Sequence, residues 1–199
     1  MIELIQEALM LLKVAIDWAL IVLVLGVVAL VVLRWIILSV KPFGWASYYI
    51  RRATDPLIWP IAQMMPTSQN SAPLLLILGV LIGAFFFKWL TDDLVQALLG
   101  LLYGLSAGLP LQIIGWVLYG AVAVLLVLIV ARIVLSWLPF LRDGRLMWTL
   151  FRLTEPIMGP FRDLVPSIGM LDLSPILLIF LLQFAQNAIV RIMGLRMMW

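Results

Sequence analysis

Residues 152–160 read RLTEPIMGP, and residues 52–60, one hundred positions earlier, read RATDPLIWP. Pro66 and Pro166 keep the same spacing. Pro42 and Pro139, and Pro73 and Pro175, pair at the similar spacings of 97 and 102, so ten of the eleven prolines have a counterpart in the other half and only Pro110 has none. Self-similarity at a fixed distance is typical of an internal repeat. The sequence therefore predicts a tandem duplication.

Long apolar stretches flank both copies of this motif. They cover residues 14–38, 72–90, 113–138 and 176–193. A helix needs about 20 apolar residues to cross roughly 30 Å of hydrocarbon, and each stretch is long enough. The chain is 65% apolar and 12% charged, about half the charge of a soluble domain. We expect an all-α polytopic membrane protein of two tandem repeats, each with two transmembrane helices joined by a proline-bent interfacial loop.

The repeat boundaries follow from these stretches. The first, diverged repeat is expected over residues 14–90 and the second over residues 111–199. Residues 94–109 would rise about 24 Å as a helix, which is short for a crossing. Residues 91–110 are therefore expected to form an interfacial or partly immersed connecting helix that Pro110 ends. Whether this segment crosses the bilayer stays open.

Each loop contains a predicted helix start. Asp55 and Glu155 precede prolines, and an acidic residue before a proline is a favourable N-cap. A second proline four residues later interrupts the helix hydrogen bonding. The prediction is a short bent helix in each loop. The prolines concerned are Pro56, Pro60, Pro156 and Pro160.

Basic residues are concentrated in both loops, which favours a cytoplasmic position for both by the positive-inside rule. These residues are Lys41, Arg51 and Arg52 in the first loop and Arg142, Arg145, Arg152 and Arg162 in the second. The expected location is the bacterial cytoplasmic (inner) membrane.

The second half resembles the YggT family, small membrane proteins of bacteria and plastids. The residues that carry the resemblance are 153–156 (LTEP), 160–162, Val165, Pro166, Gly169, Asp172, Ser174 and Pro175. The first copy departs from the pattern at Ala62, Gln63, Gln69 and Ala72. The resemblance implies an integral membrane protein without known catalysis, linked in different members to assembly of membrane complexes, osmotic tolerance or cell division.

Three groups of candidate residues follow, and the first group is the family motif in the loops, with a structural or partner-contact role. Its members are Arg52, Thr54, Asp55, Pro56, Pro60, Pro66, Arg152, Thr154, Glu155, Pro156, Pro160, Arg162, Pro166, Gly169, Asp172, Ser174 and Pro175.

Glycines suited to close helix packing form the second group, because small residues three or four apart let another helix approach. They are Gly79, Gly83, Gly100, Gly104 and Gly108.

Polar residues within apolar stretches form the third group. Arg132 is expected to snorkel from the end of its helix, with an ion or substrate contact as the alternative. Gln183, Gln186 and Asn187 form a stripe expected to hydrogen-bond between helices, with a water path as the alternative.

The composition excludes many functions. The chain has no His and no Cys, so it supplies no Cys/His zinc site, no thiolate nucleophile and no Ser-His-Asp triad. No enzyme activity, cofactor or metal is expected, since the loop carboxylates have nearby arginines as partners. The net charge of +3 is too small to suggest nucleic acid.

The leading hypothesis is a non-enzymatic scaffold, accessory subunit or assembly factor of a larger membrane complex. Its partners would be membrane lipids and other integral membrane proteins, and a homo-oligomer stays open. The alternative is a small transporter or ion pathway in osmotic or ion homeostasis. A third hypothesis is an organiser of anionic lipid that acts through Arg145, Arg152 and Arg162.

Overall fold

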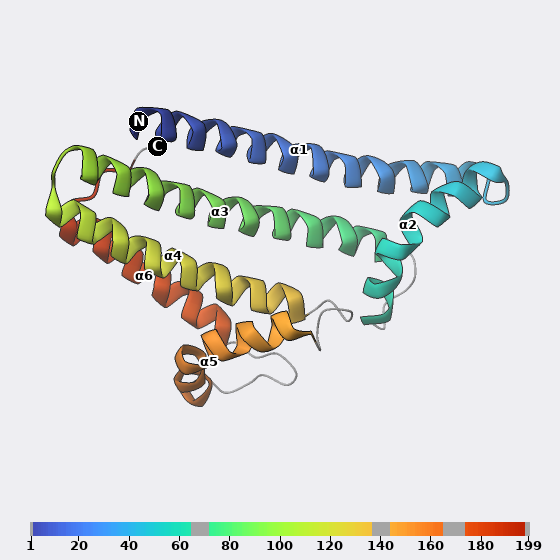
Figure 1. The fold of residues 1–199 in the computed structure, drawn as a ribbon. Helices are drawn as coiled ribbons and strands as arrows, with labels where there is room; N and C mark the ends of the chain where they lie inside the picture. Colours follow the sequence, from blue (N-terminus) through green and yellow to red (C-terminus); the bar gives the residue numbers. More distant parts are fainter. Residues whose placement is uncertain (1, 65–71, 137–143, 165–173, 198–199) are drawn as a thin grey trace. The chain divides into compact units, whose positions relative to one another are not determined.

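The chain forms helices throughout the parts that the structure describes, with no strand in those parts. The structure is a computed structural model, and it describes residues 2–64, 72–136, 144–164 and 174–197 (Figure 1). The helices in these ranges are α1 (Ile2–Val40), α2 (Trp45–Met64), α3 (Ala72–Ser106), α4 (Pro110–Ser136), α5 (Arg145–Leu164) and α6 (Ser174–Met193).

Four of these helices, α1, α3, α4 and α6, are long and apolar enough to cross a membrane. The all-α prediction is confirmed for the described residues, and each expected span falls mainly within one of these four helices. With 39 and 35 residues, α1 and α3 rise about 58 and 52 Å, which is longer than the hydrocarbon core is thick.

The segment before Pro110 differs from the prediction. Residues 91–106 continue α3 without interruption instead of forming a separate connecting helix. They include no proline, and half of them are Leu, Ala or Gln, which favour a helix, so the helix continues through this segment. The helix ends at Ser106, and Gly108, two residues later, has a φ of +63°, the left-handed conformation that glycine adopts just after helix ends. Pro110 begins α4, where its missing N–H costs nothing.

The loop helices also start earlier than predicted. α2 begins at Trp45 and α5 at Arg145, so Asp55 and Glu155 lie inside helices and are not N-caps. The paired prolines are accommodated within both helices, and each helix bends partway along its length (Figure 1). A proline removes one backbone hydrogen bond and crowds the preceding turn, which is a common cause of such bends. The sequence reasoning overestimated the ability of proline to stop the helix.

The chain divides into two compact units. Unit 2 consists of Leu11–Trp89, and its core contains Val31, Ile58, Ala72 and Leu76.

Unit 1 consists of Met1–Met10 and Leu90–Trp199, and within it α4, α5 and α6 pack against one another. One core cluster contains Ala97, Trp116, Tyr119 and Leu195. A second core cluster contains Ile129, Met158 and Leu178.

The candidate packing glycines have different surroundings. A Cβ added at Gly100 would lie 2.0 Å from the Trp116 ring, and one at Gly104 would lie 3.1 Å from Ile113, so α3 and α4 approach closely at both positions. Gly108 is the turn residue described above. At Gly79 and Gly83 an added Cβ would meet no described atom within 4 Å.

Candidate functional site

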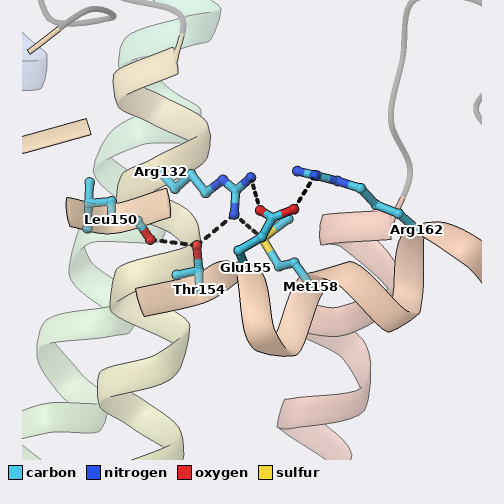
Figure 2. A network of polar contacts seen from close by, with 6 residues as sticks. All are labelled: Arg132, Leu150, Thr154, Glu155, Met158 and Arg162. Atoms are coloured by element: carbon cyan, nitrogen blue, oxygen red, sulfur yellow. Dashed lines mark hydrogen bonds and ion pairs between the residues drawn. The ribbon is translucent and has the colours of Figure 1, made fainter. Parts of the chain in front are cut away.

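Arg132 lies one turn from the end of α4 and is only 4% exposed. The expectation that it snorkels to the surface is wrong, because its side chain turns to the neighbouring helix α5 (Figure 2). A guanidinium in an apolar interior is costly unless hydrogen bonds and an opposite charge surround it. The contacts of Arg132 therefore show how this cost is offset.

Two hydrogen bonds from Arg132 reach adjacent polar residues of α5. Nη1 donates to Thr154 Oγ1 at 2.7 Å, and Nη2 donates to Glu155 Oε2 at 2.8 Å (Figure 2). Thr154 in turn donates to the backbone carbonyl of Leu150 at 2.7 Å. The Thr154 hydroxyl therefore has both a donor and an acceptor partner, and its orientation is fixed.

Two further contacts complete the pocket around Arg132. Its Nη1 also lies 3.3 Å from the sulfur of Met158, and its Cζ lies 3.7 Å from the centroid of the Phe151 ring. A cation over an aromatic face gains electrostatic stabilisation, more so when it is desolvated. Phe151, Thr154, Glu155 and Met158 recur at spacings of three and four, which puts them on one face of a helix.

Glu155 accepts from two arginines at once. Its Oε1 accepts from Arg162 Nη1 at 2.7 Å, while Oε2 accepts from Arg132 (Figure 2). Arg162 follows both prolines of α5, and its side chain extends back to Glu155. The carboxylate therefore links the end of α4 to both parts of the bent helix.

These contacts describe a structural clamp. Both terminal nitrogens of Arg132 donate hydrogen bonds within the chain, to Thr154, Met158 and Glu155. Among the described residues, no group of three or more His, Cys, Asp or Glu side chains is placed to hold a metal ion.

Unit 2 contains a matching but simpler arrangement. Arg34 of α1 donates to Thr54 Oγ1 and, at 2.5 Å, to Asp55 Oδ1 of α2. Thr54 donates to the carbonyl of Ile50 at 2.6 Å, as Thr154 does to that of Leu150. The arrangement is less buried, because the Arg34 side chain is 16% exposed against 4% for Arg132. Arg51 stands one hundred positions before Phe151, and Ala62 one hundred before Arg162.

The remaining motif residues are placed as follows. Arg152 lies over the Trp148 ring at 5.5 Å, and Arg52 donates weakly to the Tyr48 hydroxyl at 3.4 Å. Ser174 is fully buried at the start of α6, next to Pro175. Pro66, Pro166, Gly169 and Asp172 lie outside the described residues.

The amide stripe on α6 does not face a single partner. Gln186 is 5% exposed inside unit 1, Gln183 is half-buried, and Asn187 is exposed. The Asn187 side chain donates to the carbonyl of Gln183 on its own helix at 3.0 Å. Gln186 is therefore the most buried of the three amides, and Asn187 contacts its own helix.

Sequence reasoning missed a polar cluster in unit 1. Tyr119 of α4 donates to Asp93 Oδ1 of α3 at 2.7 Å. Gln186 lies near the same carboxyl group, although its Nε2 makes no hydrogen bond of ordinary geometry. Gln96, 1% exposed, contacts the sulfur of Met197 at 3.5 Å. The signal in the sequence was the acidic pair Asp92 and Asp93 between two apolar stretches.

The sequence matches a known protein family and several of its relatives. Residues 111–193 match the family described as CCB3/YggT. An uncharacterized protein of Haemophilus influenzae is 31% identical over 177 residues, covering 85% of this chain and 88% of the relative. The uncharacterized protein YggT of Escherichia coli K12 is 28% identical over 142 residues, covering 68% of this chain and 67% of the relative.

A shorter relative matches only part of the chain. The uncharacterized protein ycf19 of Guillardia theta is 37% identical over 65 residues, which are 32% of this chain and 71% of the relative. No solved structure matches. From the family match and the long relative in Haemophilus, we conclude that the chain belongs to the CCB3/YggT family.

Proposed function

We propose that the protein is a non-enzymatic integral membrane protein of the bacterial inner membrane, where it serves as a scaffold, accessory subunit or assembly factor of a larger complex. The surface of α1 is the observation that carries this proposal. Val31 is the one buried residue among those described in this helix of 39 residues. Large apolar side chains such as Trp18, Leu25 and Trp35 are exposed. A surface of this size and polarity requires lipid or another protein as cover.

The polar groups of the clamp support the same proposal. Arg132, Thr154 and Glu155 satisfy one another within the chain. An enzyme would instead present a nucleophile or a general base to a substrate. The clamp holds α5 against α4 and so gives α5 a fixed surface. A fixed surface suits a contact with another protein.

The proposal includes an origin by duplication of one unit. Arg34, Thr54 and Asp55 make the bonds that Arg132, Thr154 and Glu155 make. The core residues also pair in order, namely Val31 with Ile129, Ile58 with Met158 and Leu76 with Leu178. The ycf19 relative adds support, because 65 residues make up 71% of it, so its whole length is close to half of this chain.

In the proposed topology both loop helices lie on the cytoplasmic side. Because residues 72–106 form one helix, a single crossing by α3 returns the chain to the side from which α1 began, and α4 then repeats the path of α1. The native chain has no cysteine, so Thr149→Cys and Ala107→Cys can be labelled selectively. We expect an impermeant thiol reagent added to intact cells to label the Ala107→Cys variant and not the Thr149→Cys variant. The reverse labelling would refute this orientation.

A partner is tested by purification from native membranes in a mild detergent, with mass spectrometry of proteins in fixed stoichiometry. A photo-crosslinker on a cysteine at Trp18 or Leu25 of α1 should capture the same protein. Ala123, which is fully buried, provides the control position. A homogeneous species that contains only this chain, with no cross-link from α1, would contradict the accessory role.

A second candidate function, a small transporter or ion pathway, is favoured by one observation. Buried polar atoms of unit 1 lack hydrogen-bond partners among the described residues, including Asp93 Oδ2, Gln96 Oε1 and Gln186 Nε2. Unpaired polar groups within an apolar bundle often mark an ion or water path. Replacing Gln183, Gln186 and Asn187 by Leu should abolish proton, sodium or potassium flux in proteoliposomes if the protein transports one of them. The scaffold function predicts unchanged flux and lost assembly instead.

A further inference from the structure

A cleft of about 730 Å³ opens in unit 2 beside the end of α1. One wall consists of apolar residues of α1, including Val31 and Trp35, and the other of Leu74 and Ile77 of α3. Two cations, Arg34 and Arg51, also line this cleft. Its volume lies in the range of specific ligand sites, which are mostly apolar with a few well-placed polar groups.

The two arginines retain unused hydrogen-bonding capacity. Both hydrogen bonds that Arg34 makes to described residues come from Nη1, so its Nη2 and Nε have no partner among those residues. Arg51 makes no hydrogen bond or ion pair within those residues. Asp55 neutralises one of the two charges, which leaves one net positive charge at the cleft.

The matching position in unit 1 shows what distinguishes this cleft. There Phe151 stacks on Arg132 and helps to bury it to 4% exposure. In unit 2 the corresponding residue is Arg51, whose charge repels that of Arg34. An aromatic ring that closes the site in one unit is therefore replaced by a second cation beside an open cleft in the other.

We propose that this cleft binds an anionic phospholipid, with the headgroup phosphate between Arg34 and Arg51 and an acyl chain against the apolar walls. Guanidinium groups bind phosphate oxygens in a two-pronged geometry, and basic pockets between membrane helices commonly hold anionic lipid headgroups. The apolar walls suit an acyl chain, whereas a free phosphate would leave them uncovered. This inference rests on the proposed membrane location of the protein.

The test uses the full chain, purified from native membranes and studied by native mass spectrometry during titration with phosphatidylglycerol or phosphatidylcholine. The wild-type protein should retain one phosphatidylglycerol in preference to phosphatidylcholine. Arg51→Gln should weaken phosphatidylglycerol binding about fivefold or more, the effect of roughly one membrane-proximal cation. Arg51→Phe, which introduces the residue of unit 1, should weaken it at least as much.

Arg52→Gln is the matched control, because Arg52 is adjacent in sequence, exposed and absent from the cleft lining. Its affinity should stay close to that of the wild-type protein. Equal losses in Arg51→Gln and Arg52→Gln, or equal binding of the two lipids, would overturn the proposal. The apolar walls are tested with phosphatidylglycerols of different acyl-chain length and with inorganic phosphate. If millimolar phosphate displaces phosphatidylglycerol and its affinity does not depend on acyl-chain length, the proposed contact between the acyl chain and the apolar walls is wrong.

The membrane location is checked separately by alkaline carbonate extraction of the same variants. Release of the wild-type protein into the soluble fraction would refute the proposed function itself. Retention in the membrane together with unchanged lipid binding by Arg51→Gln would refute only the lipid site. Circular dichroism of each variant shows whether a loss of binding reflects unfolding.

Discussion

The side chain of Arg132 donates to Thr154, Met158 and Glu155 and lies over the Phe151 ring, so its removal should destabilise the fold. Arg132→Gln would leave Thr154 and Glu155 without their buried donor. Breaking a buried ion pair costs about 3–5 kcal/mol, and we expect about 3 kcal/mol because Glu155 is 44% exposed. The measurement is reversible unfolding in detergent followed by circular dichroism.

The matched change in unit 2 provides the comparison. Arg34→Gln should cost about 1 kcal/mol, since the Arg34 side chain is 16% exposed against 4% for Arg132 and water screens its pair with the half-exposed Asp55. Arg132→Lys should recover only part of the stability, because an ammonium cannot bond Thr154 and Glu155 in the fork geometry of a guanidinium. Equal losses for Arg34→Gln and Arg132→Gln would show that burial does not set the strength of the clamp.

Gly100 is required by the closeness of Trp116 and not by its backbone conformation. Gly100→Ala would place a methyl group 2.0 Å from the indole ring, so α3 and α4 must separate or Trp116 must move. Overpacking of this kind typically costs about 1–3 kcal/mol. Gly79→Ala, in open space on the same helix, should be neutral or stabilise by up to about 1 kcal/mol. The melting temperatures of the two variants, measured side by side, check both expectations.

The bent helices α2 and α5 depend on paired prolines, and removing one pair should straighten α5. In the variant that combines Pro156→Ala and Pro160→Ala, each restored N–H can complete a backbone hydrogen bond. Spin labels at Leu146 and Phe161 should then move apart toward about 22 Å, the rise of a straight helix over that interval. Pulsed electron paramagnetic resonance measures this distance in the otherwise cysteine-free chain.

Straightening should also affect the clamp. Arg162 lies beyond both prolines, so its contact with Glu155 should be lost while the contact of Arg132, made before the bend, persists. Adding Arg162→Gln to the proline variant should then cost less stability than Arg162→Gln costs on its own. An unchanged label distance would mean that packing against α4 and α6, and not the prolines, sets the bend.

The sequence predicted the long apolar helices well, because their formation depends on the composition of long stretches. Four helices able to cross a membrane follow from apolar runs alone, since length and hydrophobicity suffice to indicate them. The prediction failed at Asp55, Glu155 and residues 91–106, where local signals for a helix end were outweighed by the continuing helix. Pairing of the loop carboxylates with loop arginines was expected, as between Arg162 and Glu155, but the contact of Arg132 was missed because Arg132 and Glu155 meet only when α5 packs on α4. Spacing within one helix carries no information about that packing.

We expect the protein to assemble from two separate fragments when the chain is split at the turn between α3 and α4. Gly108 marks this turn, so fragments 1–108 and 109–199 would each keep two long helices and one bent helix. The C-terminal part of α3 belongs to unit 1 and contacts α4 through Gly100 and Gly104. Co-expressed fragments should therefore associate, and an affinity tag on one fragment should recover the other from detergent extracts.

The glycine contacts make this association specific. Gly100→Leu in the first fragment should abolish recovery, because its side chain would occupy the space of the Trp116 indole. Gly79→Leu adds the same apolar bulk to the same helix where no described atom lies within 4 Å, so it should leave recovery unchanged. If both variants still associate, contacts other than the α3–α4 packing hold the halves together. If neither does, added bulk on α3 disturbs its insertion, and the loss cannot be assigned to the glycine contact.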